Sequence, residues 1–478
     1  MTDNQRYTLF YQPKDAWVGD CMPCRHNGEL YLYYQSDKRE PKAFPDCEPF
    51  GWSLAKTSDL VNYVDYGKVL QNGPKNSRDE WLYAGSVLYA NGCFWAFYTA
   101  RCHAFWDTDT PAELVAIATS PDGVEWTKHP EWTLPKQPGY ELNFFRDPCV
   151  FRDDENDEWV MLTAQRHSEG PMNRRGVLTR HRSKDLIHWD FHGDFWAPDM
   201  FYMLEMPDAF KIGDWWYLLF SEYSTGNRTR YRMSKSLDGP WVAPKDDCFD
   251  GRCLYAARTC VREDGVRQLV GWLGTRQDDS DTGMWVWGGT TVVYQLLQEA
   301  DGTLTVHLPE EQESLFTTPS AAEQDTVSLS CDGGSDSHTL LQDAGPLCRL
   351  DCTVSFTEGT YAFGAKIYDN PEKDMGYAYH FSPGKNNVRF AKLPNYPWFQ
   401  CQNRDLDRPL QLVAGDEYHL TILVDNDVCM LYVDGVALSA RMCEKPGTAL
   451  TFYVHGGTLN VKDIRFYDNI HQQTGRGN

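Results

Sequence analysis

The sequence lacks several features that would place the chain in common functional classes. It has no run of about 18 apolar residues, so no segment is expected to cross a membrane as a helix. The first residues are polar and lack the apolar core of a signal peptide, and we therefore expect a cytoplasmic protein. Basic residues are scarce: 45 Lys and Arg face 68 Asp and Glu, for a formal net charge of -23. This deficit argues against a nucleic-acid partner and against an anionic membrane surface.

Signals for cofactors and disulfides are also missing. The 15 cysteines follow no framework spacing and are expected to be reduced. Cys21 and Cys24 spell Cys-x-x-Cys, but neither a helix start nor a second ligand pair accompanies them, so we interpret them as two unlinked thiols. The sequence contains no phosphate-binding glycine loop and no metal-ligand cluster. No cofactor and no metal are expected.

Sequence patterns typical of β-strands dominate the chain. The 478 residues are too many for one ordinary core, so at least two domains are expected. Long amphipathic helix patterns are scarce, whereas short runs rich in aromatic and β-branched residues are frequent. Examples are 30–34, 93–98, 158–162 and 215–220. The first part of the chain is therefore predicted to be all-β.

A turn motif recurs four times in this part. A hydroxyl residue stands two positions before an aspartate, and an aromatic residue follows three or four positions later. The aspartates are Asp59, Asp122, Asp185 and Asp238, so the intervals are 63, 63 and 53 residues. Hydroxyl and aspartate side chains favour tight turns between strands. A repeat of this length with several strands per copy indicates a radial β architecture.

The composition changes in the last third of the chain. Residues 314–338 are rich in Ser, Thr, Asp and Gly and are interpreted as a linker. Spaced short strands follow, with examples at 418–424, 428–433, 451–454 and 461–467, and hairpin turns between them predict a β-sandwich. We therefore expect a catalytic domain at 1–313, a linker at 314–338 and a β-sandwich at 339–478.

Three acidic residues stand where apolar or aromatic runs meet turns. They are Asp20, Asp147 and Glu205, in three separate segments of the chain. Taken singly, each has an ordinary reading: a turn aspartate, a structural ion pair with Arg146, and a surface glutamate. Taken together, they supply a nucleophile, a group that holds the sugar and a proton donor, which is what cleavage of a glycosidic bond requires.

The motifs around these acids resemble those of family 32 glycoside hydrolases, the group of β-fructofuranosidases, invertases, inulinases and levanases. The resemblance covers most of the chain and keeps the family's order. It rests on Trp17-Val18-Gly19-Asp20, Tyr33-Tyr34-Gln35, Trp52-Ser53-Leu54-Ala55, Tyr83-Ala84-Gly85-Ser86, Arg146-Asp147-Pro148, Glu205-Met206-Pro207-Asp208, Tyr255-Ala256 and Gly271-Trp272.

The resemblance implies an all-β fold, a five-bladed β-propeller followed by a C-terminal β-sandwich. It implies retaining, exo-acting hydrolysis of terminal β-fructofuranosyl units of sucrose or short fructo-oligosaccharides. Asp20 would be the nucleophile, Glu205 the general acid and base, and Asp147 the residue that binds sugar hydroxyls. The substrate would also contact Gln35, Tyr83, Arg146 and Trp272. Strand alternation places Arg146 on the face opposite Asp147, unless its side chain curls toward the site and tunes a carboxylate.

Two departures from the family's pattern adjoin the nucleophile. Gly19 stands where the family has asparagine, and Cys21 stands where it has proline. The segment 291–296 departs as well, so an unusual fructoside or another furanoside is an open alternative. Three rival functions also remain open: a fructosyl transferase, an inverting propeller hydrolase of the arabinosidase type, and a fructoside-binding protein without turnover. The expected partner is a small carbohydrate, and the sequence leaves a homo-oligomer open.

Overall fold

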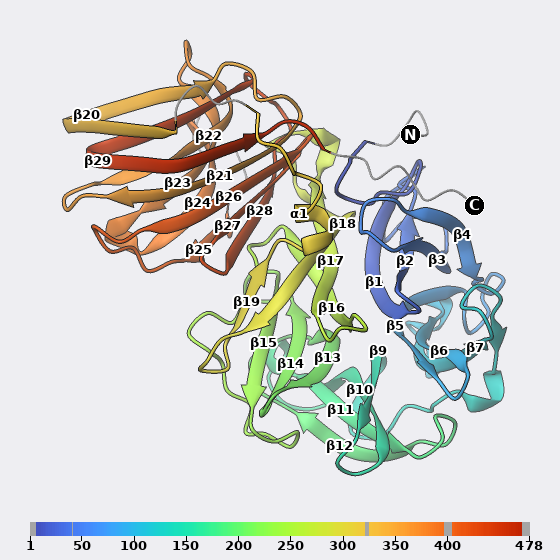
Figure 1. The fold of residues 1–478 in the computed structure, drawn as a ribbon. Helices are drawn as coiled ribbons and strands as arrows, with labels where there is room; N and C mark the ends of the chain where they lie inside the picture. Colours follow the sequence, from blue (N-terminus) through green and yellow to red (C-terminus); the bar gives the residue numbers. More distant parts are fainter. Residues whose placement is uncertain (1–5, 41, 321–324, 396–403, 471–478) are drawn as a thin grey trace.

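The computed structural model describes residues 6–40, 42–320, 325–395 and 404–470. Nearly all regular structure in these ranges is β-strand (Figure 1). The helical pieces are short: one turn of α-helix, α1 (Glu310–Glu313), and five 3-10 turns. These turns are η1 (His103–Phe105), η2 (Pro130–Trp132), η3 (Met172–Arg174), η4 (Gln277–Asp279) and η5 (Pro383–Lys385).

The first domain is a five-bladed β-propeller, as the resemblance implied. Blade 1 contains β1 (Trp17–His26), β2 (Glu29–Asp37), β3 (Trp52–Thr57) and β4 (Val64–Leu70). Blade 2 contains β5 (Trp81–Ala90), β6 (Cys93–Arg101), β7 (Glu113–Ser120) and β8 (Thr127–Lys128). Blade 3 contains β9 (Tyr140–Asp153), β10 (Glu158–His167), β11 (Gly176–Ser183) and β12 (Asp190–Trp196). Blade 4 contains β13 (Glu205–Ile212), β14 (Trp215–Glu222) and β15 (Arg228–Ser234). Blade 5 contains β16 (Leu254–Val261), β17 (Arg267–Arg276), β18 (Trp285–Gln298) and β19 (Leu304–His307).

The first strand of every blade lies at the centre of the ring. These inner strands contact one another in sequence order, β1 to β5, β5 to β9, β9 to β13 and β13 to β16, and β16 returns to β1. A backbone pairing between Val18 of β1 and Gly289 of β18 joins the first blade to the last. Figure 1 shows this junction, where the blue β1 lies beside the yellow strands of blade 5. Chain segments far apart in sequence therefore meet on one axis.

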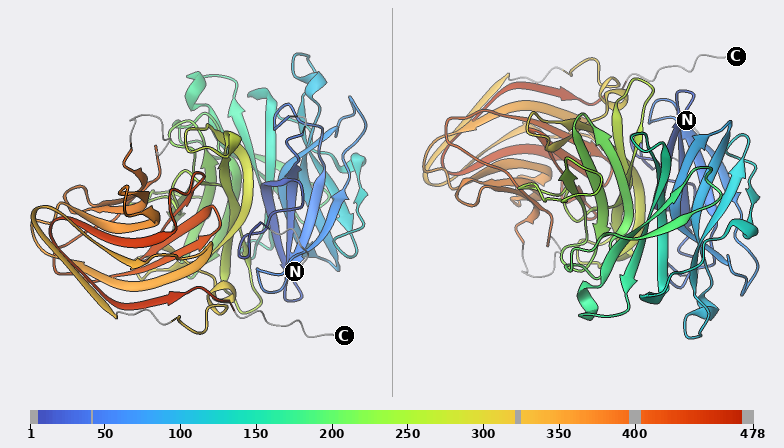
Figure 2. Two further views of the ribbon diagram at one scale, coloured as in Figure 1. Left: turned by 90° about the horizontal axis from the view of Figure 1, so that it is seen from above. Right: turned by 90° about the horizontal axis from the view of Figure 1, so that it is seen from below.

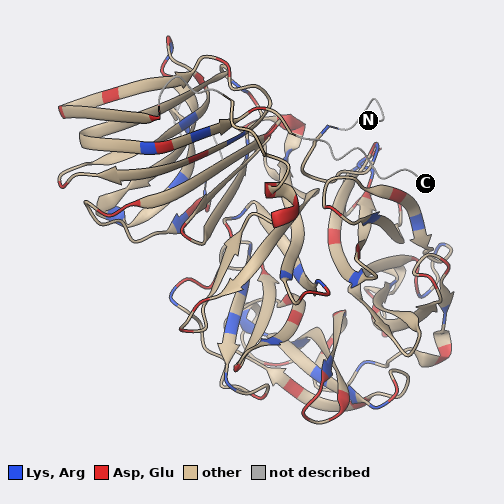
Figure 3. Cartoon of the chain, in the orientation of Figure 1, with Lys and Arg blue, Asp and Glu red and all other residues tan. Residues whose placement is uncertain are grey.

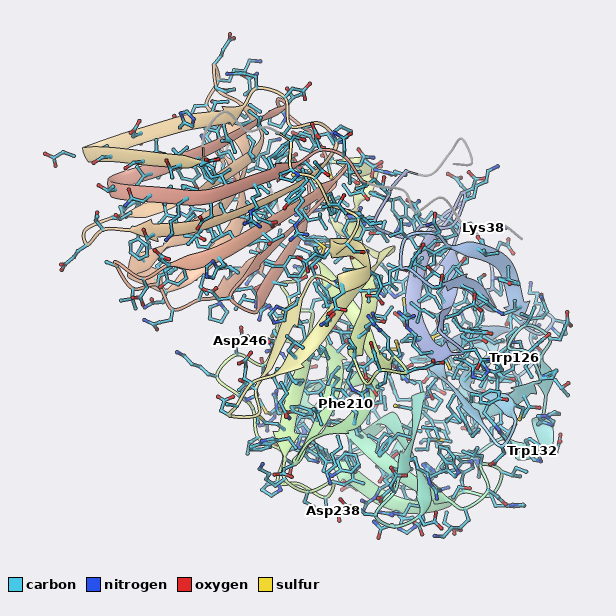
Figure 4. The ribbon with its side chains drawn as sticks, viewed as in Figure 1. Lys38, Trp126, Trp132, Phe210, Asp238 and Asp246 are labelled. Atoms are coloured by element: carbon cyan, nitrogen blue, oxygen red, sulfur yellow. The ribbon has the colours of Figure 1, made fainter. Side chains whose placement is uncertain are left out.

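The repeated turn motif forms the connection after the third strand of each of the first four blades. In the first copy, Thr57 Oγ1 accepts the backbone N–H groups of Asp59 and Leu60, and Asp59 Oδ1 accepts those of Val61 and Asn62. The copies at Asp122 and Asp185 repeat these bonds, and in the fourth Ser236 Oγ accepts the N–H of Asp238. Figure 4 labels Asp238, which lies toward the outer rim of the ring.

The second domain is a β-sandwich. Its strands are β20 (Thr326–Leu341), β21 (Leu347–Phe356), β22 (Ala362–Asn370), β23 (Met375–Ser382), β24 (Asn387–Leu393), β25 (Asp407–Pro409), β26 (Tyr418–Asp425), β27 (Val428–Val433), β28 (Val436–Arg441) and β29 (Ala449–Tyr467). β29 pairs with β22 through its first half and with β21 through its second half. This long strand therefore belongs to both layers of the sandwich.

Part of the segment expected to be a linker is instead a strand. Within 314–338, residues from Thr326 onward belong to β20, which pairs with β29. Val327 and Leu329 are buried, whereas Thr326, Ser328 and Ser330 between them are exposed. The Ser- and Thr-rich composition reflects one solvent-facing side of a strand, and the sequence signal was mistaken for a loop.

The sandwich packs against blades 4 and 5 (Figure 2). One hydrophobic cluster contains side chains from both domains, among them Leu273 and Tyr294 of blade 5 and Leu438 of the sandwich. Arg441, which is 3% exposed, crosses the boundary. Its guanidinium donates to the carbonyl oxygens of Gly274 and Leu273 and to Thr290 Oγ1, at 2.8–3.1 Å. The two domains thus share a core and a buried polar network.

Charged side chains are distributed over both domains. Figure 3 shows basic residues interspersed with acidic ones along strand ends and loops. Among the described residues, no helix is long and apolar enough to cross a membrane.

Candidate active site

Each inner strand carries an irregularity near the centre of the ring. The pairing register shifts between Val18 and Cys21 in β1, between Tyr83 and Gly85 in β5, and between Glu205 and Asp208 in β13. The pairing register also shifts in β9 between Arg146 and Cys149, and in β16 between Tyr255 and Arg258. β-Bulges of this kind bend a strand and redirect side chains, and they are frequent beside active sites.

Backbone groups that the bulges release are bound by the preceding blade. Asp147 N–H donates to Thr99 Oγ1 of blade 2 at 2.9 Å, and Met206 N–H donates to Asp147 Oδ2 of blade 3 at 3.0 Å. Ala256 N–H donates to Ser221 Oγ of blade 4 at 3.1 Å. Asp147, Met206 and Ala256 have φ values of 56°, 51° and 53°, a left-handed conformation that costs about 1–3 kcal/mol for a non-glycine residue. These bonds fix the strained positions.

A cavity of about 320 Å³ lies where the inner strands converge. Asp20, Asp147 and Glu205 all line it, so the trio of acids from three blades shares one site. The other four residues expected to contact the substrate line it as well: Gln35, Tyr83, Arg146 and Trp272. Its volume lies in the usual range for small-molecule sites.

Asp20 is held by a residue of the last blade. Trp272 donates its indole N–H to Asp20 Oδ1 at 3.0 Å. Burial, reinforced by the nearby Asp147 and Glu205, raises the pKa of Asp20 to about 8, and the Trp272 bond acts in the opposite direction. The indole therefore fixes the carboxylate and favours its charged form.

Glu205 has a different environment. Tyr255 donates its hydroxyl to Glu205 Oε2 at 2.8 Å, and Arg146 Nη1 lies 3.7 Å from Oε1. Burial raises the pKa of Glu205 to about 7, with the Arg146 charge opposing the shift and Asp147 adding to it. A carboxyl group in this range retains its proton close to neutral pH, as a general acid requires.

Arg146 points into the pocket and not to the opposite face of its strand. The left-handed conformation of Asp147 breaks the alternation of side chains along β9, so both residues line the cavity. The Arg146 guanidinium lies between two acids, because its Nε is also 3.7 Å from Oε2 of the buried Glu113. Arg146 consequently acts on the protonation of Glu205, which is the alternative the sequence left open.

Two predicted substrate contacts also have structural roles. Gln35 donates its side-chain N–H to the carbonyl of Leu82 at 3.2 Å, and this bond orients the amide toward the cavity rim. The Tyr83 hydroxyl lies 3.2 Å from His103 Nε2, and burial raises the pKa of Tyr83 to about 12. Both side chains are thus fixed before a substrate binds.

The sequence reasoning missed an aromatic wall on one side of the cavity. Phe44, Phe50 and Trp287 line it, and the Trp287 ring centroid lies 4.6 Å from that of Phe44 and 6.1 Å from that of Phe50. Trp285 and Arg252 also line the cavity, and neither lies in one of the motifs described above. A high aromatic content was visible in the sequence, but it could not distinguish wall residues from core residues.

The sandwich supports this wall indirectly. The loop between β17 and β18 contains Asp281, whose carboxylate accepts the Tyr377 hydroxyl at 2.6 Å and the Lys392 ammonium at 2.9 Å. Trp285 and Trp287 follow a few residues later. The second domain therefore anchors the segment that forms one side of the pocket.

Within the described residues, no group of three or more His, Cys, Asp or Glu side chains could hold a metal ion. Cys21 and Cys24 are both buried free thiols. Burial raises the pKa of the Cys24 thiol to about 12, so it stays protonated and unreactive.

Comparison with known proteins decides the family. The family model described as the glycosyl hydrolases family 32 N-terminal domain matches residues 10–307, which is more than half of the chain. The chain belongs to glycosyl hydrolase family 32. It is accordingly a glycoside hydrolase of the fructofuranosidase type.

Relatives in this family align over almost the whole chain. A sucrose-6-phosphate hydrolase of Escherichia coli is 25% identical over 93% of this chain and 90% of its own length. A levanbiose-producing levanase of Bacillus subtilis is 24% identical over 98% and 92%. Among solved structures, an exo-inulinase of Aspergillus awamori covers 99% of both chains with a TM-score of 0.77 and 17% identity. A sucrose-6-phosphate hydrolase of Lactobacillus gasseri has a TM-score of 0.75 and 18% identity, and covers 98% of this chain and 94% of its own. These structures share the two-domain fold.

The structure explains the departure from the family 32 pattern at Gly19. A Cβ atom at this position would overlap the six-membered ring of the Trp287 indole. Glycine beside Asp20 and tryptophan at 287 are therefore a matched pair. The space that an asparagine side chain would need is occupied by an aromatic ring.

We expect the single substitution Gly19→Asn to lower both the stability and the activity of the protein. Overpacking against Trp287 should cost about 1–3 kcal/mol of stability and displace the wall of the pocket. Combination with Trp287→Ala should restore part of the loss, because the ring is then removed. Thermal unfolding and kcat/KM for sucrose, measured for the single and double variants, check this. Gly384→Asn is the control, since nothing lies within 4 Å of a Cβ there; losses at position 19 that persist in full without the Trp287 ring would contradict the pairing.

Proposed function

We propose that the protein is a retaining, exo-acting β-fructofuranosidase that releases terminal β-fructofuranosyl units from sucrose or short fructo-oligosaccharides. The observation that carries the proposal is the convergence of Asp20, Asp147 and Glu205 on one cavity at the centre of the ring. The modest volume of this cavity, about 320 Å³, favours a single terminal sugar. Membership of family 32 supports the fructoside as substrate.

In the first step Asp20 attacks the anomeric carbon and the glycosidic bond breaks. The bond electrons pass to the leaving oxygen, which takes the proton of Glu205, and a covalent fructosyl-enzyme forms. The Trp272 indole orients the attacking carboxylate through its bond to Oδ1. The other oxygen of Asp20 then remains for the reaction.

In the second step the Glu205 carboxylate removes a proton from water, and the resulting hydroxide displaces Asp20 with a second inversion. The Tyr255 hydroxyl and the Arg146 guanidinium stabilise Glu205 in its charged form. Asp147 has a double role in this proposal. One oxygen accepts the Met206 N–H next to Glu205. We assign the other oxygen to the sugar hydroxyls because Asp147 lines the cavity.

Product analysis tests the proposal. With 1-kestose we expect fructose and sucrose as the first products, and with methanol present we expect methyl β-fructofuranoside. The α-anomer of the methyl product would indicate inversion and overturn the retaining mechanism. Cleavage of an aryl arabinofuranoside without release of fructose would favour the arabinosidase alternative. Larger oligosaccharides at high sucrose concentration would indicate transfer, and binding without release would indicate a sugar-binding protein.

A further inference from the structure

Four charged side chains of alternating sign form a row that ends at Glu205. Arg101, the last residue of β6, pairs across the strands with Glu113, the first residue of β7, and its guanidinium forms an ion pair with Oε1 of Glu113. Oε2 of Glu113 lies 3.7 Å from Nε of Arg146. Nη1 of Arg146 lies 3.7 Å from Oε1 of Glu205. We refer to these four residues as the charge row.

The Glu113 carboxylate is fully buried and firmly held. Besides its contacts with the two guanidinium groups of the charge row, its Oε2 accepts the Phe145 N–H at 3.1 Å. Arg101 is fixed as well, because its guanidinium carbon lies 4.7 Å from the ring centroids of both Tyr83 and Trp106. A buried carboxylate is costly unless it is paired and hydrogen-bonded, and these contacts meet that requirement.

The geometry lets the Glu113 charge act on Glu205 through Arg146. A guanidinium beside a carboxyl group favours the charged form of that group, and a second carboxylate on the guanidinium weakens the effect. Burial lowers the pKa of Arg146, but the charges of Glu113 and Glu205 raise it above its ordinary value. Burial raises the pKa of Glu205 to about 7, and Arg146 opposes this shift. Asp147 and Glu113 both add to it.

Other titratable groups face the two carboxyl groups of the charge row. Around Glu205 and Glu113 they are Asp20, Asp147, Tyr223 and Tyr255, and Tyr83 and His103, respectively. Substitution of Glu113 or Arg101 by glutamine leaves all of these groups in place. A difference between such variants therefore reports the charge that was removed.

We propose that Glu113 is a positioning residue for the catalytic acid: its carboxylate fixes the Arg146 guanidinium beside Glu205 and offsets part of the guanidinium charge, and Arg101 limits this offset. The inference rests on the proposed function, in which Glu205 is the proton donor. It assigns a role to two residues that do not line the cavity and therefore act on the reaction through another side chain.

The test is the pH dependence of kcat/KM for sucrose in the full-length protein, and in particular the fall at alkaline pH, the alkaline limb. In Glu113→Gln the amide keeps an oxygen for the Phe145 N–H but carries no charge. We expect its alkaline limb to move to lower pH by about 0.5–1 unit. Arg101→Gln should move the limb to higher pH, because the Glu113 charge then acts on Arg146 without a second guanidinium. In the double variant both charges are removed, so the limb should lie between those of the single variants.

Glu158→Gln is the matched control. It also removes a carboxylate that is paired with an arginine, since Oε2 of Glu158 lies 2.8 Å from Nη1 of Arg182, and it does not line the cavity. Its alkaline limb should coincide with that of the wild type. Thermal unfolding shows which variants are folded, and if Glu113→Gln is not, the direction of the shifts in Arg101→Gln and in the double variant decides.

A purely structural role of Glu113 would give a different result. The variants would then lose kcat/KM by the same factor at every pH, and the alkaline limb would not move. An unmoved limb, or shifts of the two single variants in the same direction, would overturn the positioning role and leave the fructosidase proposal intact. If the wild-type protein released no fructose from sucrose at any pH, the proposed function itself would fail.

Discussion

Asp20→Asn is expected to lower kcat for sucrose by about 10⁴-fold or more, the scale seen when a nucleophile is removed. The amide keeps the shape of the side chain and one oxygen for the Trp272 indole, but it cannot form the covalent intermediate. The stability should change in the opposite direction. Burial raises the pKa of Asp20 to about 8, so the folded state holds the proton of this carboxyl more tightly than the unfolded state does. The free energy of unfolding therefore decreases as pH rises toward 8. The variant should therefore have a higher Tm than the wild type, by about 2 °C at pH 8 and by less at pH 5.

Initial-rate kinetics and thermal unfolding at both pH values measure these effects. Asp107→Asn, at an exposed aspartate, is the matched control and should leave both the rate and Tm unchanged. Mass spectrometry of the wild type quenched during turnover should detect a fructosyl adduct on Asp20. An adduct on another residue, or a loss in kcat below about 10-fold, would remove Asp20 from its proposed role.

Glu205→Gln is expected to lower kcat for sucrose by about 10²–10⁴-fold, the range for loss of a general acid. An aryl β-fructofuranoside should be affected far less in its first step, because a phenolate leaves without a proton. In the wild type, kcat/KM for sucrose should fall at alkaline pH, above about 8, where the pair of Asp20 and Glu205 loses its last proton; burial raises their pKa values to about 8 and about 7. The charges of Asp20 and Glu205 interact, and the active form of the pair holds one proton. Each limb of the pH profile therefore describes the titration of the pair and not of one residue.

The pH profile of the variant supplies the sharper measurement. With sucrose, the residual activity of Glu205→Gln should lack the alkaline limb that the wild type shows. Azide should accelerate Glu205→Ala with the aryl substrate and yield β-fructofuranosyl azide, since an anion can replace the water that needs a base. Glu125→Gln, at a residue exposed on blade 2, is the control. An unchanged alkaline limb in Glu205→Gln would assign the proton to a different group.

Much of the fold could be predicted because its signals are local. The run 428–433 coincides with β27, and the runs 30–34 and 215–220 lie inside β2 and β14. Signals that depend on pairing were misjudged. The runs 451–454 and 461–467 belong to one strand, β29, which continues through Gly456 and Gly457 with φ values of 60° and 76°. The sequence shows a break there, whereas pairing with β20 carries the strand across it.

The residues of the candidate site also fall into those that local motifs predicted and those that they did not. All seven residues taken from the motifs line one cavity. Five of them lie at the irregular parts of inner strands, whereas Gln35 and Trp272 lie on the adjacent strands β2 and β17. The orientation of Arg146 could not be derived, because it depends on the left-handed conformation of Asp147. Trp287 and Tyr223 had no motif around them. Their place in the pocket follows from blade packing and from the β14–β15 loop, which no local pattern encodes.

The pairing of Val18 with Gly289 has a consequence for biosynthesis. The bond that orients Asp20 comes from Trp272, 252 residues later in the chain, and the same blade supplies Gly289. A nascent polypeptide therefore emerges from the ribosome with the Asp20 carboxylate unsupported until the fifth blade has been translated and has docked. Contacts between such distant segments form slowly. Recovery of hydrolytic activity during refolding should consequently be a late event, later than the fluorescence changes that report tryptophan burial within single blades.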